Sequence, residues 1–195
     1  MSCKQAPKNK VPYIGDEGRL IADSYFIRHH METRYHIDFS GGYSTDEQAR
    51  AWTIERMLEE HFYWFLVHDR WANDENFERG PRQFFLKAPA PVRPFVTWMV
   101  RRIVNKALHA QGTGRHNDAE RLELAKADVD AVSVFLGNKP YLLGDRICGA
   151  DATVFSFMLG ASCPLFESDI RRHIEQKTNI MDYVARLNGE FYGHA

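Results

Sequence analysis

Two adjacent polar residues near the N-terminus stand where they could bind an anion. Asp23 and Ser24 follow a short apolar run, and apolar residues come after them at helical spacing. Both residue types are good helix caps. The first N–H groups of a helix lack intrahelical partners and, with the helix dipole, favour a bound anion. A plain helix cap and an anion site at Ser24 are compatible interpretations, since the same N–H groups serve both.

Four aromatic and imidazole side chains could line a pocket for an apolar molecule. His61, Trp64, His68 and Trp71 recur three and four residues apart in a segment with helical periodicity. This spacing places them on one stripe of a helix. By spacing alone, core packing is the favoured interpretation, and a ligand pocket is the alternative.

Asp151 could be a catalytic acid or a helix cap. It stands three residues after Cys148, the spacing of a capping box, at the start of an apolar helical segment. We favour the cap, because a buried carboxylate is stabilised beside the free N–H groups of a helix start. A cysteine is a weaker cap than Ser or Thr.

Other reactive residue types form no recognisable site. The histidines at 29, 30 and 36 lack a metal-ligand pattern, and the three cysteines lack ligand spacing and are expected to be reduced thiols. Arg101, Arg102 and Lys106 predict a solvated helix face rather than a nucleic-acid surface. We therefore expect no metal.

The composition is that of an ordinary globular protein, and its charge balance does not favour a strongly anionic partner. The 195 residues are 44% hydrophobic and 26% charged, with a formal net charge of -1, so no overall field favours nucleic acid or anionic membranes. No run approaches the ~20 apolar residues of a membrane span, and the N-terminus lacks a signal-peptide core. We expect a cytoplasmic protein without a membrane span or a nucleic-acid partner.

The first part of the chain reads as strand, turn, strand and helix. Two short apolar runs, 11–14 and 19–22, flank a Gly and Asp turn, and the helix begins near Asp23. This unit, residues 1–38, is too small to fold alone and must dock on something. A linker-like segment rich in Gly and Ser separates it from a second domain, residues 45–195.

The second domain is predicted to be all helical, so the fold is mainly α. The periodicity predicts a long helix from Thr45 to about Trp71, a Pro-containing loop over 73–91, and helices ending at residues 112, 136, 161, 175 and 191. Asn117 followed by Glu120 resembles a capping box at the start of the helix that ends at 136. In the helix after the loop, we expect Phe95, Met99, Ile103 and Ala107 to face inward and Arg101 outward. The helix over 150–161 has small and apolar residues on every side, which predicts burial all round.

Three stretches resemble a known family. Lys10–Ile14 with Ile21–Ser24 resembles the second half of the thioredoxin-like domain of glutathione S-transferases. Pro140–Asp145 followed by Ala150–Phe155 resembles the start of the buried helix in their all-helical C-terminal domain. The segments 59–64, 70–71, 101–102 and 109–112 resemble the metaxin-like and failed-axon-connections-like branch. The resemblance implies a helical C-terminal bundle preceded by a ββα unit.

The resemblance also implies a glutathione site. A cis peptide before Pro12 would turn the Val11 main chain outward to pair with the cysteinyl part of glutathione, as an added strand does. Asp23 and Ser24 would hold the γ-glutamyl carboxylate, and Lys10 could attract the glycyl carboxylate. The 61, 64, 68 and 71 stripe would border the pocket for an apolar electrophile. Glutathione is then a co-substrate, no other cofactor is implied, and a homodimer is expected.

The first half of the thioredoxin-like domain, which carries the thiol-activating residue in the family, should precede Lys10. Only nine residues do, and we assign no catalytic role to Ser2 or Cys3 among them. We therefore expect that half, and its thiol-activating segment, to be missing and conjugating activity to be low. The function expected for the complete form is glutathione conjugation; the alternative is a non-catalytic interaction module whose open sheet edge is covered by a partner.

Overall fold

The computed structural model describes residues 6–8 and 10–193. The chain divides into two compact units, Met1–Ser44 and Thr45–Ala195. The first contains a hairpin and one helix, and the second contains helices alone among its described residues. The protein is mainly α, as the sequence predicts.

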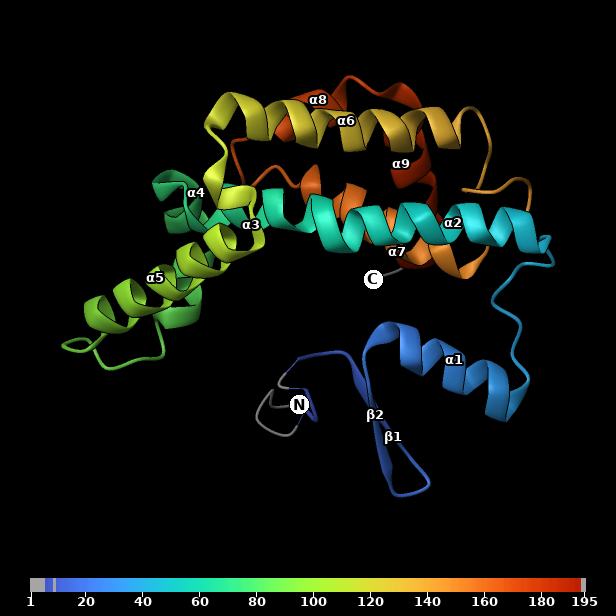
Figure 1. Cartoon of the computed structure of the whole chain (residues 1–195), viewed down its shortest axis with the longest axis horizontal. Coiled ribbons are helices and arrows are strands. Elements are labelled where there is room, and N and C mark those ends of the chain that lie inside the picture. The colour runs from blue at the N-terminus through green and yellow to red at the C-terminus, as the bar shows by residue number, and fades with distance from the viewer. Residues whose placement is uncertain (1–5, 9, 194–195) are drawn as a thin grey trace. The chain divides into compact units, whose positions relative to one another are not determined.

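The hairpin of the first unit has a tight turn. Strands β1 (Tyr13–Asp16) and β2 (Arg19–Ala22) are antiparallel, with Asp16 opposite Arg19 (Figure 1). The two turn residues, Glu17 and Gly18, have φ angles of 45° and 78°. Positive φ at both central residues matches the right-handed twist of the strands, as in a type I′ turn.

Helix α1 (Ser24–Tyr35) is fastened to the hairpin at both ends. The Asp16 carboxylate accepts a hydrogen bond from the Tyr35 hydroxyl at 2.7 Å and lies 2.7 Å from His30 Nε2. The hydrogen bond with His30 is the main cause of a lowered pKa of Asp16. At the other end, the Asp23 N–H donates to the Pro12 carbonyl at 3.0 Å. The helix start is thereby held against the segment that leads into β1.

A long helix forms the spine of the second unit. It consists of α2 (Thr45–Met57), a π-helical turn η2 (Leu58–Phe62) and α3 (Tyr63–Trp71), which continue one another in Figure 1. The predicted helix over 45–71 is confirmed, but the π turn is not evident from periodicity. Leu58 and Phe62, at the two ends of this turn, are completely buried. The turn therefore lies where the helix meets the core.

The loop predicted over 73–91 is wrong in its first half. That segment forms helix α4 (Asp74–Arg79) and a 3-10 turn η3 (Pro81–Phe85). Asn73 caps α4 by accepting a hydrogen bond from Asn76 N at 3.0 Å. Phe77 and Phe85 are buried and pack around Trp71. Burial of two aromatic rings orders a segment whose prolines suggested a loop.

Helix α5 (Arg93–Gln111) turns a different face inward from the one predicted. Phe95, Met99 and Ile103 are exposed. Arg101 points inward instead: its guanidinium lies 4.7 Å from the centre of the Phe77 ring and donates to the carbonyls of residues 71 and 72. These carbonyls end α3 and lack helical partners, so an arginine satisfies them better than an apolar side chain would. A short 3-10 turn, η4 (Thr113–Arg115), follows.

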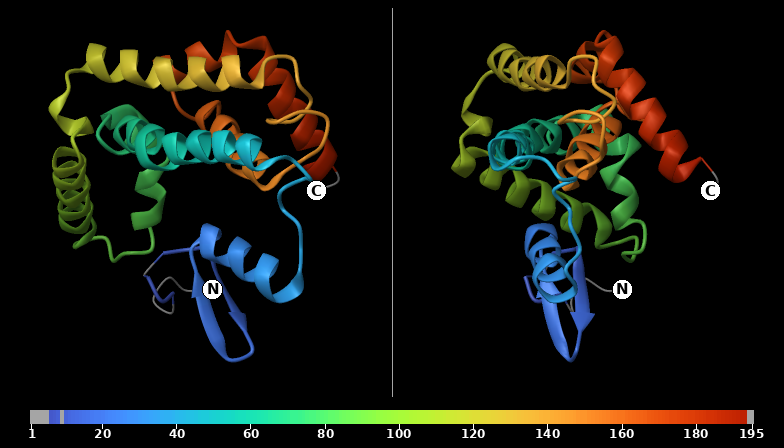
Figure 2. Two further views of the ribbon diagram at one scale, coloured as in Figure 1. Left: turned by 45° about the vertical axis from the view of Figure 1, so that its right-hand side comes forward. Right: turned by 90° about the vertical axis from the view of Figure 1, so that its right-hand side faces the viewer.

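The remaining helices are α6 (Asp118–Leu136), α7 (Gly149–Ala161), α8 (Asp169–Glu175) and α9 (Thr178–Tyr192). The capping box of Asn117 and Glu120 at the start of α6 is confirmed by reciprocal hydrogen bonds of 3.0 Å. Figures 1 and 2 both place α6 alongside the long α2–α3 helix. Within the described residues, no helix is both long enough and apolar enough to cross a bilayer.

Helix α7 is buried on one side rather than all round. Val154 and Met158 are completely buried, whereas Leu159 and Ser156 are exposed. Small and apolar residues on every face of a helix permit full burial but do not enforce it. The expectation of burial on all sides is therefore wrong.

Candidate functional site

Ser24 stands at the exposed start of α1. Its neighbour Asp23 is the N-cap and accepts a hydrogen bond from the Tyr25 N–H at 3.1 Å. Among the described residues, no hydrogen bond engages the Ser24 hydroxyl or N–H. A cap satisfies only part of the set of free N–H groups at a helix start. Ser24 thus retains two donors that can face an anion.

The backbone of Asp23 is strained. Its φ of 86° and ψ of 132° lie in a region that non-glycine residues rarely adopt and that costs roughly 1–3 kcal/mol. Three local hydrogen bonds hold it there: its N–H donates to Pro12 O, its carbonyl accepts from Ile27 N, and its carboxylate accepts from Tyr25 N. These three bonds fix the direction in which the Asp23 and Ser24 side chains leave the backbone.

The segment just before β1 lies beside this helix start. The Val11–Pro12 peptide is cis, which confirms the expectation from the family resemblance. Val11 and Lys10 are exposed, and no hydrogen bond to the Val11 main chain is found among the described residues. The bond from Asp23 N to Pro12 O brings residues 11–12 and 23–24 together. Ser2 and Cys3 lie outside the described residues.

His61 is held by a buried carboxylate. Its Nδ1 lies 2.7 Å from Asp128 Oδ2 on α6, and its ring meets that of Phe65 edge-on with centroids 4.8 Å apart. The Asp128 side chain is only 9% exposed, whereas His61 is 43% exposed. Burial raises the pKa of Asp128, and the hydrogen bond to His61 offsets part of this. The carboxylate orients the imidazole and leaves Nε2 available to a ligand.

His68 lines a different surface. It belongs to a pocket of about 370 Å³ between α3, α6 and α8, together with Asp69, Arg121 and Ser168. Burial lowers the pKa of His68 and raises that of Asp69 to about 6. This lining is rich in charged and hydroxyl groups, unlike a typical pocket for an apolar molecule.

The two tryptophans of the stripe pack against aromatic neighbours. Trp64 meets the ring of Tyr63 with centroids 5.4 Å apart, and Trp71 stacks on Phe84 at 6.5 Å. The pocket that contains His68 does not have His61, Trp64 or Trp71 among its lining residues. Their role as a second-substrate pocket stays a prediction.

Asp151 is a structural cap whose carboxylate oxygens are occupied by hydrogen bonds from within the protein. It is completely buried, and its oxygens accept hydrogen bonds from Leu142 N at 2.7 Å, Cys148 N at 2.9 Å and the Tyr183 hydroxyl at 2.9 Å. Burial, and then the Asp151 charge, raise the pKa of the Cys148 thiol to about 12. This thiol is therefore unreactive at neutral pH.

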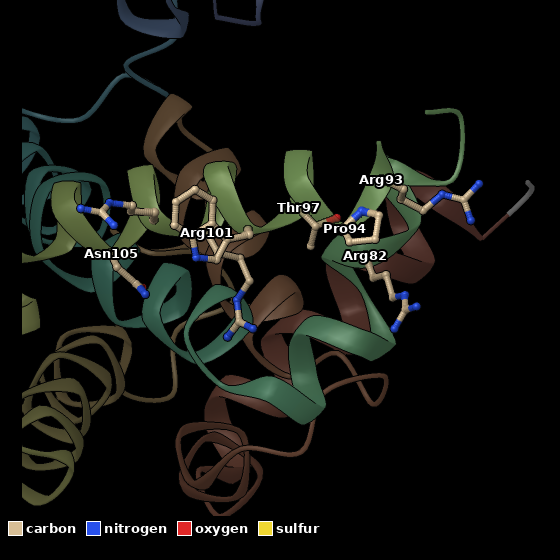
Figure 3. Close-up of a pocket in the computed structure, with 8 residues that line it drawn as sticks. Arg82, Arg93, Pro94, Thr97, Arg101 and Asn105 are labelled. Carbon is tan, nitrogen blue, oxygen red and sulfur yellow. The ribbon is translucent and has the colours of Figure 1, made fainter. Parts of the chain in front are cut away.

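Sequence reasoning missed a cationic pocket on the flank of α5. Its volume is about 600 Å³, and no acidic side chain is among its lining residues, which are Arg82, Arg93, Pro94, Thr97, Trp98, Arg101, Arg102 and Asn105. Figure 3 shows Arg101 and Asn105 projecting from the same side of α5, with Arg82 contributed by η3. The signal that could have revealed it is the lack of Asp and Glu across this segment.

Both halves of the chain match models of one family. The model of the glutathione S-transferase N-terminal domain matches residues 1–76, and that of the glutathione S-transferase C-terminal domain matches residues 125–187. With a match of this extent, the expectation that half of the N-terminal domain is missing is not borne out.

The relatives include one named transferase and two proteins without an enzyme name. The chain is 28% identical to the isoprene-epoxide–glutathione S-transferase of Rhodococcus sp. (strain AD45), over 96% of this chain and 80% of the relative. It is 24% identical to Failed axon connections of Drosophila melanogaster, over 96% and 48% of the two chains. With human Metaxin-1 the identity is 25%, over 94% and 41%. This chain thus spans about half or less of the last two relatives.

Among solved structures, a delta-class glutathione transferase of Nilaparvata lugens matches 96% of this chain and 68% of its own length. The identity is 13% and the TM-score 0.48, too low a similarity to establish the fold. The assignment comes instead from the two domain models, in their expected order, and from the sequence relatives. The chain belongs to the glutathione S-transferase superfamily, in its metaxin-like branch.

Proposed function

We propose that this protein binds glutathione through residues 10–24 and conjugates its thiol to a small apolar electrophile. The observation that carries the proposal is the helix start at Asp23 and Ser24. Its strained backbone is held beside Pro12, and the Ser24 donors have no partner among the described residues. Such an arrangement suits the γ-glutamyl end of glutathione, which carries a carboxylate and an ammonium group on one carbon.

Each part of glutathione has a complementary group in this unit. The Ser24 hydroxyl and N–H donate to the γ-glutamyl carboxylate, where the helix dipole also helps. The Asp23 carboxylate, exposed beside them, accepts from the ammonium. The Val11 main chain pairs with the cysteinyl backbone as an added strand, and Lys10 attracts the glycyl carboxylate.

The reaction is a nucleophilic substitution or ring opening at carbon. The thiol must lose its proton, because the thiolate is the nucleophile. With an epoxide, the class named for the Rhodococcus relative, the sulfur forms a bond to a ring carbon, the C–O bond breaks, and the released oxygen takes up a proton. His61, Trp64, His68 and Trp71 remain the proposed contacts of the electrophile.

The test is thermal stability with and without glutathione. A ligand that binds only the folded protein stabilises it by about 1.4 kcal/mol at tenfold excess over Kd, which corresponds to roughly 3–6 °C for a chain of this size. Cysteinylglycine, which lacks the γ-glutamyl group, should give no shift. γ-Glutamylcysteine, which lacks glycine, should retain most of it.

Ser24→Ala should abolish the glutathione shift without lowering the melting temperature of the free protein. Thr178→Ala is the matched control, since Thr178 is likewise an exposed first residue of a helix, α9. Equal shifts for parent and Ser24→Ala would reject the proposed site. Turnover of a model epoxide, followed as loss of free thiol, tests the conjugation step.

A non-catalytic interaction module is the second candidate. Among the described residues, β1 pairs with a strand on one side only, so its other edge can accept a strand from a partner or a second copy. Two of the relatives, Failed axon connections and Metaxin-1, carry names that specify no reaction. A glutathione-induced shift without turnover, together with a homodimer or a stable complex, would favour this candidate over the enzyme.

A further inference from the structure

The segment from Gly80 to Asn117 contains no acidic residue, although Asp and Glu number 26 in the 195-residue chain. It holds the cationic residues Arg82, Lys87, Arg93, Arg101, Arg102, Lys106 and Arg115. The segment covers η3, α5 and η4, which follow one another at one end of the helical unit in Figure 1. A chain with net charge close to zero thus carries a concentrated positive region, which favours an anionic partner.

The outward face of α5 combines these cations with large apolar side chains. Phe95 is 63% exposed, Trp98 55% and Ile103 58%, and Met99 is also exposed. Helical spacing places Arg102 and Lys106 on the same arc of the helix. We call this set the α5 face: Phe95, Trp98, Met99, Arg102, Ile103 and Lys106.

The cations of the α5 face and its flank differ in the hydrogen bonds and ion pairs that they already make within the protein. Arg101 is committed to the carbonyls of residues 71 and 72 and to Asp74. The Arg102 guanidinium lies 5.5 Å from the centre of the Trp98 ring and has no ion pair or hydrogen bond among the described residues. Arg93, in the adjoining pocket, is partly used: its Nη2 donates to the carbonyls of residues 86 and 88, whereas its buried Nε lacks a partner.

We propose that the α5 face docks on a membrane surface of anionic phospholipids. The helix would lie flat, with Phe95, Met99 and Ile103 in the acyl boundary and Trp98 at headgroup level. Arg102 and Lys106 would contact lipid phosphates, and the adjoining pocket, about 600 Å³ and without acidic lining, would admit a headgroup. Aromatic and aliphatic groups beside Lys and Arg on one helix are the composition that binds this interface.

Charge and side-chain type favour a membrane over other occupants. A second copy placed symmetrically on the same face would bring Arg102 and Lys106 near their own equivalents, and like charges oppose such a contact. Nucleic acid would match the cations and could stack on Trp98, but it offers nothing apolar to Met99 or Ile103. Acyl chains and phosphates together match both kinds of side chain.

The test is flotation of the full chain with vesicles of phosphatidylcholine, with and without phosphatidylserine. Binding is expected to the mixed vesicles and not to phosphatidylcholine alone. Each basic residue near an anionic surface contributes about a fivefold change in partitioning. Arg102→Gln with Lys106→Gln should therefore weaken binding about 25-fold, and Ile103→Asp by about tenfold or more.

Matched control variants distinguish a specific effect of the α5 face on vesicle binding from a general effect of net charge or surface hydrophobicity. Arg19→Gln with Arg50→Gln removes the same net charge from exposed positions outside the segment, and Val134→Asp places a carboxylate on an aliphatic site of α6 that is 83% exposed. Both controls should bind like the parent.

Absence of binding to the mixed vesicles, or equal losses in variants and controls, would overturn the proposal. So would a homodimer that Ile103→Asp dissociates, or binding of single-stranded nucleic acid without vesicle binding. Inhibition of vesicle binding by millimolar glycerophosphate alone would also overturn it, because free phosphate rather than a lipid surface would then be the ligand.

Discussion

Replacement of Asn76 by Asp should be among the most damaging isosteric changes in the chain. Asn76 is completely buried at the start of α4. Its Nδ2 donates to the carbonyls of Asp69 and Glu167 at 3.2 and 2.8 Å, and its Oδ1 accepts from Glu167 N at 2.9 Å. Asp keeps the acceptor but turns both donors into an oxygen that faces two carbonyls. Two lost hydrogen bonds and a buried, unpaired charge should cost about 3–5 kcal/mol at neutral pH.

For a chain of this size, such a loss corresponds to a fall of roughly 6–20 °C in melting temperature. Far-UV circular dichroism during heating and urea titration measures it, with Asn138→Asp as a control at an exposed position that should change little. The folded state favours the protonated form of the new carboxyl group, because a protonated acid can donate a hydrogen bond to one of the two carbonyls. The defect should therefore grow as pH rises above about 4, the ordinary pKa of Asp, and become constant above the folded-state pKa. A melting temperature within about 2 °C of the parent at pH 7.5 would refute the bridging role of Asn76.

Three further changes test other parts of the structure. Burial raises the pKa of Asp69 to about 6, so the native state retains a proton between about pH 4 and 6 and loses stability as pH rises through this window. Asp69→Asn should thus stabilise the protein by about 1–2 kcal/mol at pH 7.5, as seen in urea titrations, with no gain near pH 4. Gly114→Ala should destabilise by about 1–3 kcal/mol, because the added Cβ would lie 2.8 Å from the backbone nitrogen of His109; an unchanged urea midpoint would contradict this close approach. Cys148→Ser should be neutral or up to about 1 kcal/mol stabilising, since Ser is the stronger cap, and a clear fall in melting temperature would show that the thiol is needed for packing.

The elements that the sequence predicts correctly are those specified by neighbours in the chain. Asn117 and Glu120 satisfy each other's N–H groups across three residues, and the structure retains that capping box. The turn between β1 and β2 needs only two residues with positive φ, one of them Gly18. The Asp151 cap likewise depends first on Cys148, three residues earlier. Such interactions depend only on the local backbone, so caps and turns can be predicted from nearby residues without knowledge of the rest of the fold.

Interactions between distant segments account for what the sequence did not reveal. Periodicity predicted that α5 is a helix but not which of its sides faces inward. Arg101 lies on the inner side because it donates hydrogen bonds to carbonyls at the end of α3, and Phe95 and Ile103 are left exposed. The π turn at 58–62 places His61 against Asp128, a partner 67 residues away that no spacing rule identifies.

The sequence alone therefore determined the two strands and most of the helices, though not α4 or η3, together with where several of them begin and the family to which their order belongs. Only the tertiary structure decided which helix faces are covered, that Asn76 bridges segments 91 residues apart, and that an acid-free segment presents aromatic and cationic side chains together. The physical reason is range: capping and turn energies are set within a few residues, whereas burial and charge pairing depend on which distant atoms the folded chain brings into contact.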